Sequence, residues 1–172
     1  EGPMPSEAQV VGDLLHGMGR EYGATTGRER RCGWFDAVTV RQAAMLNGIT
    51  DLAVTNLDGL DTLESIKVCV GYRLGGKRID HHPSDHGRLA KCRAIYETFP
   101  GWQKPTDRIR TWKTLPLNAR RYAQALAKLT GTKLSYASVG PARSQTRSEE
   151  HTLNSSHVVI SSAVFCLKKT NV

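Results

Sequence analysis

Residues 66–72, IKVCVGY, form a nearly continuous apolar run, and this run constrains the fold more than any other feature. A strand with one solvated face alternates apolar and polar residues, whereas a strand covered on both faces is apolar throughout. The shorter run LAVT at 52–55 has the same character. The two runs therefore predict buried strands of the kind found in parallel sheets.

Helical patterns alternate with these strands. Residues 10–19, VVGDLLHGMG, have helical apolar spacing and end in glycine. Asp36 can cap a helix that runs to about Asn47, and a third helix is predicted between Pro116 and Gly131. Because strands and helices alternate along the chain, the sequence predicts an α/β fold.

The remaining segments carry weaker signals. Gly75 and Gly76 predict a tight hairpin into KRID, and LSYASVGPAR at 134–143 predicts a last strand that leads into a loop. Residues 81–114 are expected to be mostly irregular. The run HHPSDH at 81–86 raises the alternative of a metal site, but its spacing matches no standard zinc pattern, so no metal is predicted there.

Composition narrows the functional classes. The chain has 24 Lys and Arg against 16 Asp and Glu, a net charge of +8, which suits anionic ligands. Its basic residues are dispersed and only 6% of its residues are aromatic, so no nucleic-acid partner is expected. No apolar run reaches the roughly 18 residues that a membrane-spanning helix needs, so no membrane partner is expected either.

The four cysteines indicate the redox setting. Cys32, Cys69, Cys92 and Cys166 show no CxxC pairing, which argues against a zinc site or a disulfide framework. Cys69 lies inside the apolar run and is predicted to be a buried, reduced thiol. With no signal peptide at the start of the sequence, a cytoplasmic localisation is expected.

The stretch REYGATTGRERRCGWFD at 20–36 carries the strongest chemical signal, in an arginine loop that comprises residues 24–30. The hydroxyls and backbone N–H groups of residues 25–27 can hold a carboxylate in a glycine turn. Arginine can bind carboxylate or phosphate through two parallel N–H hydrogen bonds. In an extended loop, Arg28 and Arg30 project to the same side because they are two residues apart. Such a loop suits a small dicarboxylate beside a phosphate. The alternative is a solvated surface loop with incidental arginines.

Two further loops follow predicted strands, at the edge of the sheet where α/β proteins bind ligands. In TNLD at 55–58, the carboxylate of Asp58 can accept hydrogen bonds from N1–H and the exocyclic amine of guanine, donors that adenine lacks. In SVGP at 138–141, backbone N–H groups can meet the guanine carbonyl. Asp58 could instead be an ordinary turn former. Together the two loops indicate the base-recognition edge of a GTP site.

In the same order, these segments resemble the adenylosuccinate synthetase family. REYGATTGRERRCGWFD resembles the aspartate-binding loop of that family, and LAVTNLDGLD is similar to its guanine-recognition loop. The segments GPMPSE, IKVCVGYR, YETFPGW, LP with a later A..Y, and SVGPAR also match in order. The resemblance covers residues 1 to about 146. It implies that they form the C-terminal third of a large α/β protein with a central, mostly parallel sheet of P-loop GTPase-like character.

The resemblance implies a GTP-dependent ligase that joins IMP and L-aspartate into adenylosuccinate, with GDP and phosphate as the other products. It also implies a homodimer for the full-length enzyme, and Mg²⁺ whose ligands lie outside this chain. It assigns the aspartate and IMP loop to Ala24, Thr25, Thr26, Gly27, Arg28, Glu29 and Arg30, of which Arg28 also lies toward IMP and Glu29 is structural or solvated. It assigns GTP binding to Arg30, Asn56, Leu57, Asp58, Ser138, Val139 and Gly140.

The chain also departs from the family pattern. The family commonly has TKLD where this chain has TNLD, and the shorter Asn56 cannot pack a lysine stem over the base. Guanine selectivity is therefore expected to survive with weaker affinity. No phosphate loop of the GxxxxGK type occurs, and none of the 6 histidines matches the catalytic histidine of the family. The chain contains no predicted catalytic residue and is expected to be inactive alone.

The two ends of the sequence carry separate signals. The opening EGPMPSEAQ has no initiating methionine at its start and resembles the middle of a loop, so the chain is expected to be a fragment. In the last part, RSEEHT and AVFCLKK resemble pieces of a translated sequencing adapter, so residues 147–172 are expected to form no domain. The alternative is a genuine extension with a β-rich strand, VVISSAVFCL at 158–167.

A second function stays open on the residues alone: a stand-alone module that binds RNA or anionic metabolites through the arginine loop. Steep salt dependence with any polyanion would indicate such a module. Salt-tolerant, saturable binding of GTP or aspartate would indicate the ligase.

Overall fold

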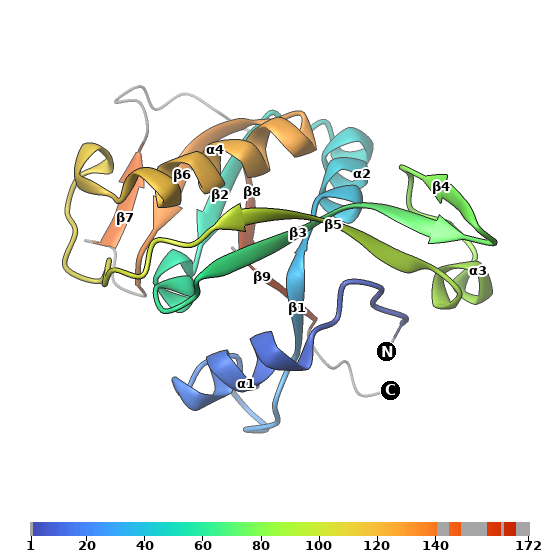
Figure 1. Cartoon of the computed structure of the whole chain (residues 1–172), viewed down its shortest axis with the longest axis horizontal. Helices are drawn as coiled ribbons and strands as arrows, with labels where there is room; N and C mark the ends of the chain where they lie inside the picture. The colour runs from blue at the N-terminus through green and yellow to red at the C-terminus, as the bar shows by residue number, and fades with distance from the viewer. Residues whose placement is uncertain (1, 141–144, 149–157, 163, 168–172) are drawn as a thin grey trace.

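The computed structural model describes residues 2–140, 145–148, 158–162 and 164–167. Within this part of the chain, helices pack on two sheets that lie side by side (Figure 1). No helix among the described residues is long and apolar enough to cross a bilayer.

The first sheet is mixed. Its strands are β1 (Arg31–Asp36), β3 (Ser65–Leu74), β4 (Lys77–Ile79), β5 (Arg93–Pro100) and β9 (Val164–Leu167). They follow the order β4-β3-β1-β9, and β5 pairs with β3. Strands β1 and β3 are parallel, with Phe35 opposite Val68, whereas the other pairs are antiparallel. The apolar run of β3 thus has one parallel neighbour, β1, as its pattern predicts, and two antiparallel ones.

The second sheet is the mostly parallel one. Its strands are β2 (Asp51–Thr55), β6 (Lys133–Ser138), β7 (Thr146–Ser148) and β8 (Val158–Ser162), in the order β7-β6-β2-β8. Strand β2 is parallel to both β6 and β8, and Val54 lies opposite Ala137. Because β2 and β6 are parallel neighbours, their carboxyl ends meet at one edge. The loops that follow these two strands are thereby brought together.

The helices of the described residues are α1 (Gln9–Gly17), α2 (Ala37–Asn47), α3 (His86–Ala90) and α4 (Leu117–Thr130), with short 3-10 turns η1 (Leu57–Leu60) and η2 (Trp112–Thr114). Helices α2 and α4 begin and end where the sequence predicts caps, whereas α3 lies in a stretch expected to be irregular. The carboxylate of Asp36 accepts hydrogen bonds from the N–H groups of Val38 and Thr39, both at 3.0 Å. Helix α4 follows Pro116 and ends at Gly131, which has a φ of 71° that suits glycine.

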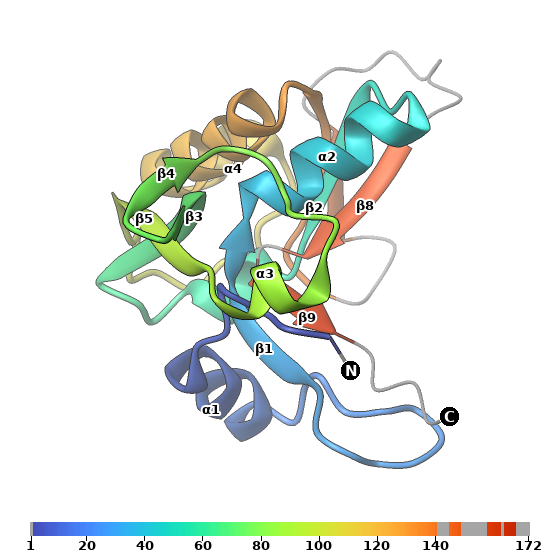
Figure 2. The same cartoon turned by 90° about the vertical axis from the view of Figure 1, so that its right-hand side faces the viewer.

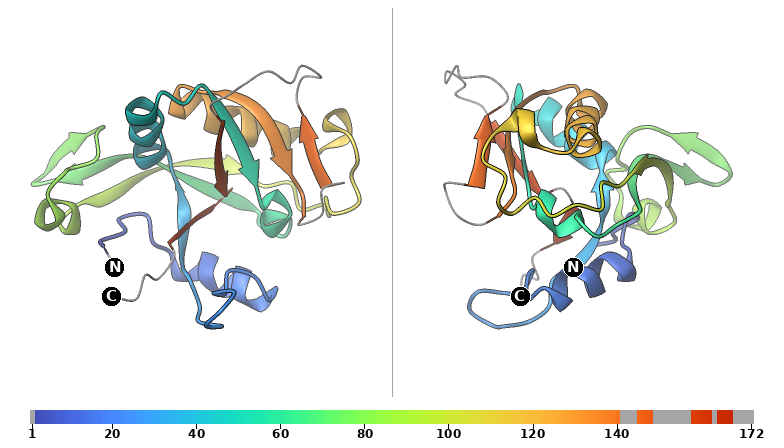
Figure 3. Two further views of the ribbon diagram at one scale, coloured as in Figure 1. Left: turned by 180° about the vertical axis from the view of Figure 1, so that it is seen from behind. Right: turned by 60° about the vertical axis from the view of Figure 1, so that its left-hand side comes forward.

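The hydrophobic core lies between the sheets and their helices. Helix α4 covers β6 and β2 (Figure 3) and buries Tyr122, Ala123 and Leu126. Helix α1 packs on β1 and buries Val11 and Leu15. The contacts of α4 support β2 and β6 below the edge at which both strands end.

Two strands lie where the sequence predicts none. Strand β1 occupies part of the stretch interpreted as a loop, and it contains Gly33, a residue that usually weakens strands. A Cβ at Gly33 would come within 2.2 Å of the Ser6 carbonyl oxygen, so only glycine admits the segment that crosses there. Strand β5 lies within residues 81–114, which are expected to be irregular. Its side chains are mostly half-exposed, which removes the apolar signal of a buried strand.

The last part of the chain contains strands. Strand β8 pairs with β2 and strand β9 pairs with β1, so the alternative of a β-rich segment at 158–167 is confirmed in its conformation. The expectation that residues 147–172 form no domain is not decided by these pairings. Their adapter-like origin stays a prediction.

Candidate functional site

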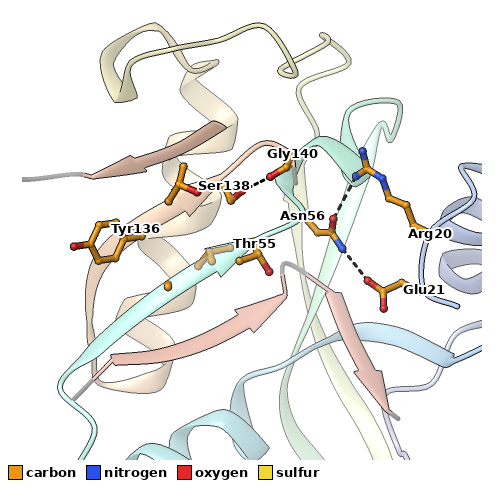
Figure 4. A pocket seen from close by; sticks show the side chains of 10 residues that line it. Arg20, Glu21, Thr55, Asn56, Tyr136, Ser138 and Gly140 are labelled. Atoms are coloured by element: carbon orange, nitrogen blue, oxygen red, sulfur yellow. Dashed lines mark hydrogen bonds between the residues drawn. The ribbon is translucent and has the colours of Figure 1, made fainter. Parts of the chain in front are cut away.

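A cavity of about 750 Å³ opens where β2 and β6 end side by side. Figure 4 shows it between these strands and the segment that follows α1. The residues that line it are Arg20, Glu21, Ala53, Val54, Thr55, Asn56, Tyr136, Ser138, Gly140 and Thr146. The TNLD and SVGP loops thus reach one cavity, as predicted from the parallel strands.

The loop after β2 is fixed by its own turn and by the core. Asn56 has a φ of 62°, in the left-handed region that asparagine tolerates better than most residues. Leu57 and Leu60 in η1 are fully buried and anchor the turn. Leu57 does not line the cavity, and its predicted part in GTP binding stays a prediction. The anchoring positions Asn56 and Asp58 on either side of it.

The loop after β6 is held by hydrogen bonds within the protein. The hydroxyl of Ser138 donates to the carbonyl oxygen of Gly140 at 2.7 Å, and both residues line the cavity (Figure 4). Val139 is fully buried, and its N–H donates to the carbonyl oxygen of Gln145 at 3.0 Å. An internal acceptor thus holds the Val139 N–H in this structure, and the predicted contact of residues 138–140 with a base stays a prediction.

Asp58 lies behind the cavity wall. Its side chain is only 6% exposed, and Nη2 of Arg20 donates to its Oδ2. This hydrogen bond raises the pKa of Arg20 above its usual value. Oδ1 of Asp58 is buried and has no hydrogen-bond partner among the described residues. The predicted base-reading carboxylate is therefore present, but Arg20 stands between it and the cavity.

A chain of side-chain contacts joins the cavity to the arginine loop. Nη1 of Arg20 donates to Oδ1 of Asn56 at 3.3 Å, and Nδ2 of Asn56 donates to Oε1 of Glu21 at 2.9 Å (Figure 4). The other oxygen of Glu21, Oε2, accepts a hydrogen bond from Nη1 of Arg30 at 3.2 Å. Glu21 thereby connects a residue of the base cavity with a residue of the arginine loop.

The arginine loop is a turn closed by backbone hydrogen bonds. The N–H of Gly23 donates to the carbonyl oxygen of Arg28, and the N–H of Gly27 donates to the carbonyl oxygen of Gly23, both at 2.8 Å. Gly27 has a φ of 63°, which a glycine adopts without strain. The loop projects beyond the lower end of β1 (Figure 2).

A hollow of about 210 Å³ lies on this loop, lined by Gly23, Ala24, Thr25, Thr26, Arg28, Glu29 and Arg30. Arg28 and Arg30 face the same hollow, as their spacing predicts. Glu29 is 67% exposed, and its Oε2 lies 3.8 Å from Nδ1 of His16. The neighbouring Arg31 points elsewhere, because its Nε donates to Oε1 of Glu7 at 2.9 Å. Arg31 is thus paired within the protein, and the structural or solvated role expected for Glu29 stays a prediction.

Several lining residues carry no sequence prediction. Arg20 and Glu21 precede the arginine loop, and Thr55 and Tyr136 belong to the strands whose loops are predicted to bind the base. Their position next to predicted segments is the only signal that could have suggested them. The contact between Arg20 and Asp58 joins residues 38 positions apart, and no local pattern indicates it.

The site does not offer a place for a divalent cation. No group of three or more His, Cys, Asp or Glu side chains with the arrangement of a metal site occurs among the residues that the structure describes. The two carboxylates nearest the cavity, Glu21 and Asp58, already accept hydrogen bonds from arginines. The donor set of the described residues therefore does not fit Mg²⁺.

Comparison with known proteins identifies relatives of this arrangement. The family model described as adenylosuccinate synthetase matches residues 1–147. The adenylosuccinate synthetase of Clostridium botulinum (strain Eklund 17B, type B) is 49% identical over 147 residues, which are 85% of this chain and 34% of that protein. The corresponding enzyme of Geobacillus sp. (strain WCH70) is 48% identical over the same length.

A solved structure has a similar fold. The fully ligated adenylosuccinate synthetase from Plasmodium falciparum aligns with a TM-score of 0.82 and 32% sequence identity, over 87% of this chain and 37% of that one. The chain thus spans about a third of the length of the relatives that it matches.

Proposed function

The chain belongs to the adenylosuccinate synthetase family, and from this premise we propose that it supplies the guanine-recognition and aspartate-binding parts of a GTP-dependent ligase. In the proposed reaction, GTP phosphorylates the 6-oxygen of IMP. The amine of L-aspartate then displaces the phosphate and gives adenylosuccinate. The cavity at the ends of β2 and β6 would bind the guanine base, and the hollow on the arginine loop would bind aspartate.

Asp58 would give the cavity its preference for guanine. A buried carboxylate can accept hydrogen bonds from both N1–H and the exocyclic amine of guanine, whereas adenine offers neither donor at this edge. The side chain of Asp58 is 6% exposed, so a base that reaches it has to supply the donors that solvent does not. Asn56, Ser138 and Gly140 would line the rest of the base site.

The arginine loop would hold the amino-acid substrate. Thr25, Thr26 and Arg28 would bind the carboxylates of L-aspartate, and Arg28 would also lie toward IMP. Arg30, which Glu21 fixes from one side, would face the GTP side. Arginine suits this role because its planar guanidinium binds carboxylate with two parallel hydrogen bonds. These groups orient the attacking amine and offset charge, and none of them transfers a proton.

The rest of the activity would come from outside these residues. Mg²⁺ would assist phosphoryl transfer by offsetting the charge of the phosphates, at ligands that this chain does not supply. We place the enzyme in the cytoplasm, as a homodimer without nucleic-acid or membrane partners. The free thiols of Cys69 and Cys92 support a reducing compartment.

One observation supports this proposal most strongly. The TNLD and SVGP loops meet at one cavity, and a chain of contacts joins that cavity to the arginine loop. NMR titration of the isotope-labelled chain with GDP, ADP and L-aspartate tests it. We expect GDP to shift the backbone signals of residues 55–58 and 136–140, and L-aspartate to shift those of residues 23–30. Equal responses to ADP and GDP would contradict it, as would binding of any polyanion with steep salt dependence.

A further inference from the structure

Arg20 separates the base cavity from the carboxylate that is proposed to read the base. It lines the cavity, whereas Asp58 does not. Its Nη2 donates to Oδ2 of Asp58, and its Nη1 donates to Oδ1 of Asn56 at 3.3 Å. A base that enters the cavity therefore meets a guanidinium group before it can reach the carboxylate.

We propose that Arg20 is a further specificity-determining residue, whose guanidinium holds the place of guanine at Asp58 and leaves only when a base supplies equivalent donors. This inference rests on the proposed guanine-binding function. The chemical likeness is direct, because guanidinium and the N1–H and amine edge of guanine both present N–H donors around one planar carbon. Binding would exchange one planar donor group for another at the same carboxylate.

The hydrogen bonding of the two carboxylate oxygens of Asp58 indicates why guanine would displace Arg20. Oδ2 of Asp58 is held by Arg20, whereas Oδ1 is buried and has no hydrogen-bond partner among the described residues. Guanine offers two donors and would satisfy both oxygens, so the carboxylate of Asp58 accepts one more hydrogen bond after the exchange, while Arg20 also gives up its contact with Asn56. Hypoxanthine offers only N1–H, and adenine offers no donor on this edge. The gain therefore falls in the order guanine, hypoxanthine, adenine.

Arg20 is able to leave its position. Its side chain is 30% exposed, so the guanidinium has solvent beside it and is not enclosed in the core. Withdrawal of Arg20 exposes the carboxylate to the cavity without any change in β2 or β6.

Arg20 also changes what adenine meets. While Arg20 pairs with Asp58, an adenine base can enter the cavity and leave that pair intact. Without Arg20, the same base would have to strip water from an unpaired carboxylate, which is costly in a buried place. Removal of Arg20 should therefore strengthen guanine binding, since the competitor is gone, and should not strengthen adenine binding.

Isothermal titration of the full chain with GDP, IDP and ADP at one ionic strength tests the proposal. The variants are Arg20→Met, which keeps the apolar stem, and Arg20→Lys, which keeps the charge but not the planar donor pair. Arg121→Met is a control that removes the same charge from the exposed face of α4. Circular dichroism and thermal melting of each variant check that the chain is folded.

We expect Arg20→Met to bind GDP about tenfold more tightly than the natural chain, by the scale of one hydrogen bond to a charged group. IDP should gain less, ADP should gain nothing, Arg20→Lys should fall in between, and Arg121→Met should match the natural chain. An unchanged or weaker affinity for GDP in folded Arg20→Met, or an equal gain for GDP and ADP, would overturn the role of Arg20. The proposed function would survive that result if the natural chain still prefers GDP to ADP. Absence of guanine-nucleotide binding by both proteins would overturn the two proposals together.

Discussion

The base cavity and the arginine loop solve the problem of binding an anionic substrate in different ways. The polar groups of the cavity are buried or partnered before any ligand arrives: Arg20 holds Asp58, and Gln145 accepts from the Val139 N–H. The arginine loop is an exposed turn closed by backbone hydrogen bonds, and the side chains of Thr25, Thr26 and Arg28 are exposed on it. The difference indicates that a ligand of the cavity displaces existing hydrogen-bond partners, whereas a ligand of the loop binds to side chains that already face solvent.

The largest expected effect is on base selection in the cavity. Asp58→Asn replaces an acceptor by an amide and should weaken GDP binding about 100-fold, because the wrong pairing leaves buried polar groups unsatisfied. The new amide N–H can meet a carbonyl at the 2-position, so a xanthine nucleotide should become the better ligand. Titration with GDP and XDP measures this effect. Retained preference for GDP would show that the two regions do not differ as described.

A smaller and separate effect is expected in the loop. Arg28→Met should weaken L-aspartate binding at least tenfold, by the loss of a charge-assisted hydrogen bond, and leave GDP binding unchanged. The thermal midpoint should hardly move, because Arg28 is exposed. NMR titration with L-aspartate and a melting curve provide both readouts. A drop in GDP affinity of the same size would show that the base cavity and the arginine loop act as one site.

Glu21 should reveal how strongly the regions are coupled. Glu21→Ala removes the acceptor of both Asn56 and Arg30, so the affinities for GDP and for L-aspartate should each fall about threefold. Glu21→Gln keeps the size of the side chain and can accept from only one side, so it should have about half of that effect in free energy. Loss of affinity for one ligand alone would show that the contact chain carries no coupling.

The smallest effect concerns the core beneath both regions. Burial raises the pKa of the Cys69 thiol to about 12, so the thiol stays protonated in the folded protein at neutral pH. Because the folded pKa exceeds the ordinary value, the contribution of this thiol to stability is complete below pH 9 and is lost as the pH rises from about 9 to 12. Cys69 should therefore resist alkylation at pH 8 in the native protein and react after denaturation, as mass spectrometry would show. Rapid native labelling would contradict its burial.

Local signals in the sequence account for much of the fold. Asp36, Pro116 and Gly131 mark helix ends that the structure confirms, because capping depends on residues close in sequence. Strand β1 has no such signal, since the reason for Gly33 is the backbone of Ser6 that passes beside it. Strand β5 has no buried side chain and is defined by its pairing with β3.

The candidate site likewise has one part that local sequence signals predict and one part that only the folded structure defines. Asp58 and the arginine loop could be predicted because residue type and spacing carry their chemistry. The placement of Arg20 on Asp58, and of Glu21 between Asn56 and Arg30, depends on contacts across 9 to 38 residues of sequence. Those contacts exist only once β2, β6 and the segment after α1 have packed together. For the same reason, the internal bond of the Val139 N–H could not be foreseen.

A structure of the chain with GDP bound tests the central claim most directly. The account predicts guanine in the cavity at the ends of β2 and β6, with N1–H and the exocyclic amine on the two oxygens of Asp58 and with Arg20 withdrawn. A base bound elsewhere, or bound in the cavity while Arg20 still covers Asp58, would contradict it.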